Sequence, residues 1–151
     1  MRQGASGKVK KVGYTTGVWD LFHVGHLNLL RRARLECDYL IVGVTTDELS
    51  EAGKGRTPII PFAERLSIIE GLRWVDSVVP QVNYDKWEAW NNFKFNVMFV
   101  GDDWRNSARW NGLEAKFQEV GVDIVYLPYT THTSSSKLRG ILDRFEQADG
   151  R

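Results

Sequence analysis

The order of apolar and amphipathic segments is the feature of this sequence that most restricts its fold. Short apolar runs alternate with stretches in which apolar residues recur at helical spacing. Strands that alternate with helices predict an α/β domain whose parallel sheet carries helices on both faces. The predicted strands are residues 12–16, 39–44, 77–79, 97–100 and 124–127, and the predicted helices are residues 27–35, 61–74, 85–93, 113–119 and 134–146.

The same pattern suggests how the chain is divided. Residues 1–10 are basic and contain glycine and serine, and we expect a flexible leader there. Residues 11–147 then form one domain, because no repeat or interdomain linker interrupts the alternation. Residues 51–61 are polar and contain two glycines and two prolines, which predicts a long loop. In a parallel sheet, ligands bind beyond the carboxyl ends of the strands, so the loops at that edge are the candidate site.

Composition excludes several classes of protein. Net charge is +1, so no overall field favours nucleic acid or an acidic membrane surface. No apolar run reaches the roughly 18 residues of a membrane span. Cys37 is the single cysteine; we expect it to be buried as a small apolar residue, and the lack of any disulfide favours a cytoplasmic location. Recognition of an anion would have to come from a local cluster of donors.

The loop after the first predicted strand contains such donors. It reads Gly-Val-Trp-Asp-Leu-Phe-His-Val-Gly-His over residues 17–26 and opens a helix. A helix N-terminus favours phosphate through its free amides and its dipole. His23 and His26 add N–H donors, Gly17 allows a backbone to approach a ligand, and Gly25 leaves space between the imidazoles. The segment therefore predicts a site for a nucleotide phosphate chain.

The histidine pair has two other possible interpretations, a zinc site and a pair of surface histidines at a helix start. Helical zinc ligands are usually four residues apart, whereas His23 and His26 are three apart, and His132 is the only other histidine. We therefore expect no metal ligated by this pair. Two surface histidines at a helix start would be the ordinary interpretation of the pair alone, but the strand, the glycines and the helix around it favour nucleotide binding.

This segment resembles the signature of the cytidylyltransferase-like nucleotidyltransferases, which have His-x-Gly-His after a Gly-x-aromatic-Asp turn. The resemblance runs from about residue 12 to residue 142. Gly101-Asp102-Asp103-Trp104 and Tyr126-Leu127-Pro128 are similar to the glycerol-3-phosphate cytidylyltransferase branch in particular. The resemblance implies a single Rossmann-like domain. It also implies a homodimer, since members of the family are commonly dimers.

The resemblance also implies roles for individual residues. The catalytic group would be His23, His26 and Arg56, which contact the triphosphate and stabilise charge on the α-phosphate. Lys54 and Lys86 would bind the phosphate of the acceptor. The full set of implied nucleotide-binding residues is Gly17, Val18, Trp19, His23, Gly25, His26, Arg56, Arg73, Asp102, Tyr129, Thr130, Thr133, Ser134, Ser135 and Ser136.

The last motif departs from the branch that it resembles. The branch has an arginine where this chain has Tyr129, which replaces a charged fork with an aromatic face. His132 could restore a donor, and the hydroxyls of Ser134 to Ser136 could still bind phosphate oxygens or simply cap the helix. Val18 stands where the branch often has threonine. These differences bear on which base and which acceptor the chain would select.

The reaction that the resemblance implies is transfer of a cytidylyl group from CTP to a small phosphorylated alcohol, with glycerol 3-phosphate as the first candidate. CDP-glycerol and pyrophosphate would be the products, and Mg²⁺ would accompany the triphosphate as a cofactor. No nucleic acid or membrane partner is expected. Two alternatives stay open: an adenylyltransferase of the same fold that acts on a sugar phosphate or a flavin precursor, and a nucleotide-binding protein without catalysis.

Overall fold

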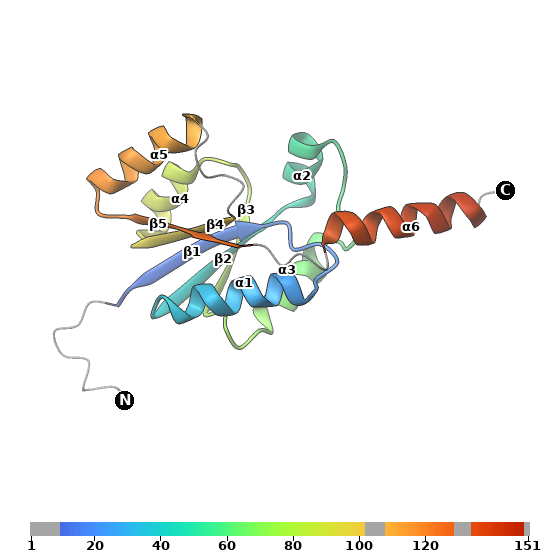
Figure 1. The fold of residues 1–151 in the computed structure, drawn as a ribbon, viewed down its shortest axis with the longest axis horizontal. Helices are drawn as coiled ribbons and strands as arrows, with labels where there is room; N and C mark the ends of the chain where they lie inside the picture. Colours follow the sequence, from blue (N-terminus) through green and yellow to red (C-terminus); the bar gives the residue numbers. More distant parts are fainter. Residues whose placement is uncertain (1–9, 102–107, 129–133, 150–151) are drawn as a thin grey trace.

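The computed structural model describes residues 10–101, 108–128 and 134–149. In these residues the predicted sheet is confirmed: five parallel strands lie in the order β3-β2-β1-β4-β5 (Figure 1). The strands are β1 (Val12–Gly17), β2 (Tyr39–Thr45), β3 (Ser77–Gln81), β4 (Val97–Gly101) and β5 (Asp123–Leu127), and the helices are α1 (Val24–Leu35), α2 (Asp47–Lys54), α3 (Phe62–Glu70), α4 (Lys86–Phe93), α5 (Ala108–Glu119) and α6 (Ser135–Asp149).

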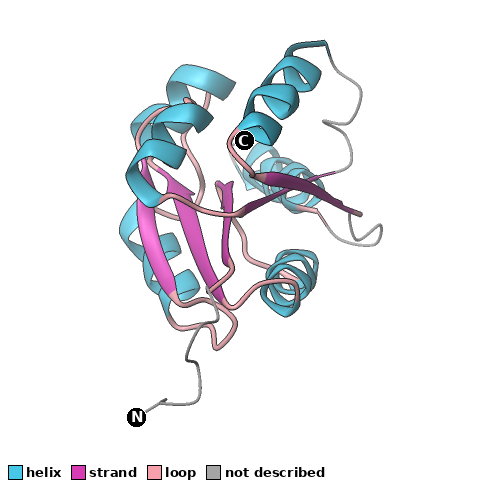
Figure 2. Ribbon diagram, turned by 90° about the vertical axis from the view of Figure 1, so that its left-hand side faces the viewer, coloured by secondary structure: helices cyan, strands magenta, loops and turns pink. Residues whose placement is uncertain are grey.

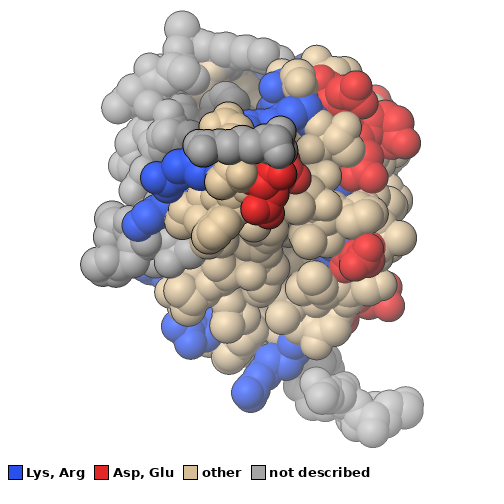
Figure 3. Space-filling model, turned by 90° about the vertical axis from the view of Figure 1, so that its right-hand side faces the viewer, with Lys and Arg blue, Asp and Glu red and all other residues tan. Residues whose placement is uncertain are grey.

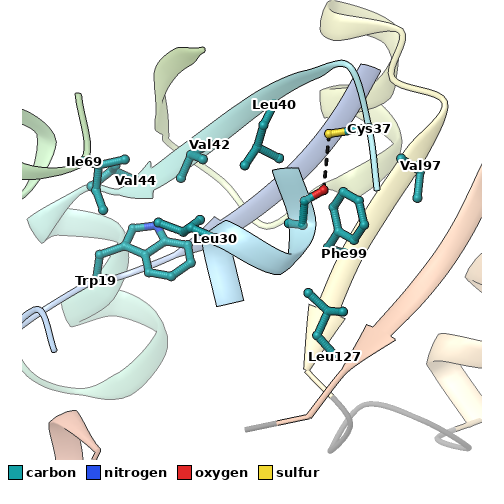
Figure 4. Close-up of a cluster of buried hydrophobic side chains, with 11 residues drawn as sticks. Trp19, Leu30, Cys37, Leu40, Val42, Val44, Ile69, Val97, Phe99 and Leu127 are labelled. Atoms are coloured by element: carbon teal, nitrogen blue, oxygen red, sulfur yellow. Dashed lines mark hydrogen bonds between the residues drawn. The ribbon is translucent and has the colours of Figure 1, made fainter. Parts of the chain in front are cut away.

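Helices cover both faces of the sheet, as Figure 2 shows. On one face, α1 and α3 bury Leu30 and Ile69 against the apolar side chains of β2, in the cluster of Figure 4. On the other face, α4 and α5 pack Trp87 and Phe117 against β1 and β4. Cys37 belongs to the first cluster and is buried, as the sequence predicted. The two cores fix the sheet between two layers and leave its carboxyl edge for a site.

The order of the strands defines where that site should lie. The chain runs outward from β1 through β2 to β3, and then crosses back to place β4 on the other side of β1. The connections that leave β1 and β4 therefore diverge to opposite faces of the sheet. A crevice opens at such a reversal of strand order, beyond the carboxyl ends of the two strands.

Three predicted boundaries are wrong. Residues 51–54 are not loop but the end of α2, a helix that the sequence analysis missed; the Thr46 side chain caps its start, and Gly55 ends it in the left-handed conformation (φ 75°). Helix α3 stops at Glu70 instead of residue 74, and the amide of Gly71 bonds back to carbonyls of its last turn. Helix α5 begins at Ala108, five residues earlier than predicted.

Helix α6 leaves the body of the molecule. It begins beside the carboxyl edge of the sheet and then projects outward (Figure 1). None of its residues is fully buried, and Leu142 and Phe145 on it are exposed. Contacts with the body are made by its first turns, through Ser135 and Arg139.

The described surface carries charges of both signs. On the face shown in Figure 3, basic and acidic side chains form separate small groups with uncharged side chains between them. Among the described residues, no helix has both the length and the apolar character required to cross a membrane.

Candidate active site

A cavity of about 1140 Å³ opens at the carboxyl edge of the sheet, around the ends of β1 and β4. It is large enough for a nucleotide together with a small acceptor. Among the described residues, five cationic side chains and two carboxylates line the cavity. The lining thus has an excess of three positive charges, whereas the net charge of the whole chain is +1. These charged residues are Lys54, Arg56, Lys86, Lys116 and Arg139, with Asp20 and Asp85. The described lining of the cavity is therefore positively charged, which favours an anion there, whereas the protein as a whole is nearly neutral.

The two histidines of the motif occupy different positions. His23 is the N-cap of α1, and its Nδ1 accepts a hydrogen bond from the amide of Gly25 at 3.0 Å. The His23 ring stacks on the His26 ring at 4.0 Å between centroids. His26 lines the cavity, whereas His23 is not among the residues that line it. The amide of Gly25 is thus already bonded to a side chain of the protein, and phosphate binding at the start of α1 stays a prediction.

His26 is held as a neutral hydrogen-bond donor. Burial, reinforced by His23 and opposed by Asp20, lowers the pKa of His26 to about 4. Its Nδ1 accepts from the amide of His23 at 3.4 Å, so the neutral ring carries its proton on Nε2. That Nε2 lies 3.4 Å from Oγ of Ser135, which in turn donates to the carbonyl of Asp20 at 2.6 Å. The donor faces the cavity at the start of α6.

Asp20 joins three parts of the chain around this edge. Its carboxylate is 2 % exposed and accepts from the amides of Leu21, Ile59 and Ile60. Arg139 of α6 donates to Oδ2 at 2.6 Å. These bonds outweigh burial and hold the pKa of Asp20 below its usual value. The loop after β1, the segment before α3 and the start of α6 are therefore fixed by one carboxylate.

Arg65 joins the same loop to β2 and α2. Its guanidinium is fully buried and donates to the carbonyls of Val18, Thr45 and Ile60 and to the carboxylate of Asp47, at 2.6–2.8 Å. All three guanidinium nitrogens are engaged. These bonds hold a strained loop, since Trp19 and Leu21 have φ of 58° and 50°.

Cationic side chains gather at one end of the cavity, which we call the cationic end: Lys54, Arg56 and Arg139, with His26 and Ser135. Burial, together with the nearby charges of Arg139 and Arg56, lowers the pKa of Lys54. Gly55 separates Lys54 and Arg56, which brings both side chains to the cavity at the end of α2. The structure thus unites four predicted residues, His26, Lys54, Arg56 and Ser135, with Arg139, for which the sequence carried no prediction.

A second group consists of uncharged polar side chains at the carboxyl ends of β1, β2 and β3 together with one lysine. Lys86, at the start of α4, donates to Oγ1 of Thr16 at 2.9 Å, and burial lowers its pKa to about 8. Thr45 donates to the side chain of Gln81 at 2.7 Å. This polar end of the cavity, Thr16, Thr45, Gln81 and Lys86, offers hydroxyl, amide and amine groups to a small polar molecule.

Gly17 and Trp19 line the cavity for a reason other than the predicted one. A Cβ on Gly17 would lie 2.8 Å from the indole of Trp19, so the glycine accommodates this neighbouring ring as well as lining the cavity. Trp19 is buried, and its Nε1 donates to the carbonyl of Gly43 at 3.0 Å. Val18 lines the cavity while its carbonyl accepts from Arg65. These residues shape the loop that presents His26.

Some predicted residues are not brought to the cavity. Arg73 is exposed, lies over the ring of Trp74, and precedes the amino end of β3, at the opposite edge of the sheet. Ser134 caps α6 by accepting from the amide of Lys137, whereas Ser135 and Ser136 line the cavity. Asp102, Tyr129, Thr130 and Thr133 lie outside the described residues, as does His132.

No cluster of three or more His, Cys, Asp or Glu side chains that could hold a metal ion occurs within residues 10–101, 108–128 and 134–149. Asp20, whose charge acts on His26, already accepts hydrogen bonds from three amides and a guanidinium. The described side chains therefore offer donors for an anion rather than ligands for a resident cation.

Comparison with known proteins gives this arrangement a family. The family model described as cytidylyltransferase-like matches residues 14–141. The glycerol-3-phosphate cytidylyltransferase of Bacillus subtilis is 34% identical over 87% of this chain and 95% of its own length. The FAD synthase of Pyrococcus abyssi is 33% identical over 87% and 89%.

A solved structure supports the fold. The lipopolysaccharide core biosynthesis protein of Thermoplasma volcanium superposes with a TM-score of 0.68 over 83% of this chain and 100% of its own. Its sequence is 23% identical, so the similarity concerns the architecture alone.

Proposed function

This chain belongs to the cytidylyltransferase-like family of nucleotidyltransferases, and we propose that it transfers a cytidylyl group from CTP to a small phosphorylated alcohol. Glycerol 3-phosphate is the first candidate, because relatives that cover most of the chain are named for it. The products would then be CDP-glycerol and pyrophosphate. A cytoplasmic location and a homodimer stay predictions.

One observation carries the proposal: His26, Lys54, Arg56 and Ser135 converge at the cationic end of a cavity that also has a polar end. A triphosphate needs several donors and positive charges close together, which the first end supplies. A phosphorylated alcohol needs hydroxyl and amine partners, which Thr16, Gln81 and Lys86 supply at the other end. The α-phosphorus would lie between the two ends.

The chemistry needs no protein nucleophile. An oxygen of the acceptor phosphate is already ionised at neutral pH, so it attacks the α-phosphorus of CTP directly. The new P–O bond forms as the bond between the α-phosphorus and the bridging oxygen breaks, and the electron pair leaves with pyrophosphate. The protein has to align the two phosphates and stabilise the charge that accumulates between them.

The described residues suit these tasks. The ring of His26 is neutral and held in place, and its Nε2–H group can donate a hydrogen bond to an α-phosphate oxygen. Arg56 neutralises the phosphate chain of the nucleotide from the end of α2, and Lys54 beside it binds the acceptor phosphate. Lys86 aligns the acceptor phosphate, and a bound phosphate would draw its amine fully into the protonated form.

We propose that Mg²⁺ arrives with the triphosphate as part of the substrate. The described residues form no acidic cluster that would hold the ion by itself. Magnesium commonly binds through substrate phosphates and waters, where it neutralises charge on the phosphate oxygens.

Substitution of His26 tests the role of the site. We expect His26→Ala to lower turnover by about two to three orders of magnitude, the usual cost of removing one donor to a transition-state oxyanion. Thermal unfolding would check that the variant is folded, and Arg31→Ala, on the exposed side of α1, would serve as the control. Near-normal turnover in folded His26→Ala would contradict the proposed role.

An adenylyltransferase is the second candidate, since FAD synthases are as similar to this chain as several cytidylyltransferases are. Pyrophosphate release should be measured with CTP and with ATP against glycerol 3-phosphate, phosphoethanolamine and FMN. Release with CTP and glycerol 3-phosphate supports the first proposal, and release with ATP and FMN replaces it. Nucleotide binding without release under every pair would favour the non-catalytic alternative.

A further inference from the structure

Gln81, the last residue of β3, is a buried polar side chain at the polar end of the cavity. It is 7 % exposed and lines the cavity. Its Oε1 accepts a hydrogen bond at 2.7 Å from Oγ1 of Thr45, which is itself buried at the end of β2. The main chain is fixed as well, since the carbonyl of Gln81 accepts from the amide of Thr46 at 3.1 Å. The side chain is therefore held in one orientation before any ligand binds.

The other half of the Gln81 carboxamide is a pair of N–H donors. Because Oε1 is engaged by Thr45, Nε2 is the group that Gln81 presents to the cavity. Within the described parts of the chain, no carbonyl or side chain accepts a hydrogen bond from this nitrogen. An amide whose donors face a cavity favours a ligand atom that can accept a hydrogen bond, because a buried donor without a partner is costly.

The order of the strands places Gln81 at a distance that suits the tail of a short acceptor. Lys86 donates to Thr16 at the end of β1, whereas Gln81 ends β3, and β2 lies between these two strands. Two strand spacings amount to about 10 Å. A phosphate bound by Lys86 would leave the rest of the acceptor to extend across the end of β2 toward Gln81. A phosphate and a carbon chain of about three atoms, together with the two side chains, span such a distance.

The groups along this path discriminate between hydroxyl and ammonium. Nε2 of Gln81 and Nζ of Lys86 are both N–H donors. A hydroxyl oxygen can accept from Nε2, whereas an ammonium has donors alone and would also meet the positive charge of Lys86. Asp85 lines the cavity too, but it is exposed, and its Oδ1 caps α4 by accepting from the amide of Glu88 at 3.0 Å. The buried groups therefore favour a hydroxyl.

We propose that Gln81 determines which acceptor the protein uses: its amide group donates to a hydroxyl oxygen of the acceptor, which is a polyol phosphate and not an amino-alcohol phosphate. This inference rests on the proposed function and narrows its substrate class. A site that donates a hydrogen bond to a substrate hydroxyl discriminates strongly against an analogue without it, because the buried donor is then left unpaired. Thr45 has a positioning role, since it fixes which end of the carboxamide faces the acceptor.

Pyrophosphate release from CTP, measured as kcat/KM for three acceptors, tests the assignment. The acceptors are glycerol 3-phosphate, phosphoethanolamine, and propyl phosphate, which has no free hydroxyl. Gln81→Glu keeps an oxygen for Thr45 but presents a carboxylate oxygen to the cavity in place of the N–H donors. We expect its kcat/KM for glycerol 3-phosphate to fall about 10- to 100-fold and that for phosphoethanolamine to rise, since an ammonium can donate to the new oxygen.

A second variant and a control complete the experiment. Gln81→Met should lower kcat/KM for glycerol 3-phosphate to the value for propyl phosphate and leave propyl phosphate itself unchanged, because that acceptor never used the amide. Either variant alone gives the answer if the other does not fold. Gln118→Glu makes the same change on the exposed side of α5, outside the cavity, and should use all three acceptors as the wild type does.

The outcomes separate this inference from the proposed function. An equal loss for all three acceptors would make Gln81 a structural residue and overturn the inference, as would an unchanged kcat/KM for glycerol 3-phosphate. A wild type that uses phosphoethanolamine or propyl phosphate as well as glycerol 3-phosphate would also overturn it. In each case release of pyrophosphate from CTP leaves the proposed function standing. A wild type that releases none with any of the three acceptors would overturn the proposed function and this inference with it.

Discussion

Arg65 and Arg139 are two arginines near the same loop, each paired with a carboxylate, but their surroundings differ. Arg65 is fully buried and donates to three carbonyls and Asp47. Arg139 lines the cavity and donates to Asp20, and its buried Nε has no acceptor within the described residues. Arg65 uses its N–H donors on groups of the protein, whereas Arg139 has N–H donors that are available to a ligand in the cavity.

The difference distinguishes a residue that builds the site from one that serves it. When every donor of a buried cation is satisfied by the protein, its loss affects the fold first. When donors remain unsatisfied at the edge of a cavity, the loss affects ligand binding first. The four variants below test this distinction on the free energy of unfolding, from the largest expected change to the smallest.

Arg65→Met should give the largest change. It removes the ion-pair partner of the Asp47 carboxylate and one donor from each of three carbonyls, so we expect a loss of about 3–5 kcal/mol in the free energy of unfolding. That is a large part of the stability of an ordinary domain. Urea denaturation measures it, with Arg31→Met on the exposed side of α1 as the control. A loss no greater than that of the control would remove Arg65 as a structural centre.

Asp20→Asn should follow. One of the two carboxylate oxygens becomes an amide that cannot accept, so a backbone amide of Ile59 or Ile60 loses its partner. We expect a loss of about 1–3 kcal/mol, and weaker CTP binding because Arg139 is no longer held in place. Asp143→Asn, on exposed α6, is the control. If stability falls and CTP binding does not, Asp20 supports the loop but does not orient Arg139.

The pH dependence of stability should reveal His26. Its pKa is lowered from 6.5 to about 4 in the folded protein, so the unfolded chain binds more protons between these values. The contribution of His26 to the free energy of unfolding is therefore full above pH 6.5. It declines by about 1–2 kcal/mol, for a half-buried group, as the pH falls toward 4. His26→Gln, which does not titrate, should remove this part of the slope and leave those of His23 and Asp20. Parallel curves for both proteins would refute a low pKa.

Arg139→Gln should change stability least. Asp20 keeps its three amides, so we expect a loss of about 1 kcal/mol, well below that for Arg65→Met. The same urea measurement on both variants gives the ratio directly. Comparable losses would mean that the two arginines have the same structural role, and the distinction between them would fail.

The sheet could be predicted from sequence because each strand is a short apolar run, such as Tyr39–Thr45. Such a run can be recognised from the residues next to it in the sequence, without knowledge of distant contacts. Helix α2 was missed because its glycine and polar residues looked like a loop. Two signals were present: Thr46 before Asp47 and Glu48 marks a helix start, and Gly55 marks its end. Local rules therefore contained the information.

The site was predicted less completely, and for a different reason. His26, Lys54, Arg56 and Lys86 could be assigned because a motif or a resemblance points to each of them. Asp20 and Arg139 are 119 residues apart, and no local pattern relates them. Arg65 likewise reaches Val18 across 47 residues. For Arg73, resemblance alone could not show that its turn lies at the other edge of the sheet, so its role stays a prediction.

The buried amine of Lys86 also has a consequence for chemical reactivity. With a pKa of about 8, its amine is far more often neutral near neutral pH than that of an ordinary lysine. At pH 8 about half of the Lys86 side chains would be free bases, against under about 1% for a surface lysine. Acylating reagents attack the free base, so a small one that can enter the cavity should modify Lys86 ahead of the surface lysines. An occupant of the polar end would shield it.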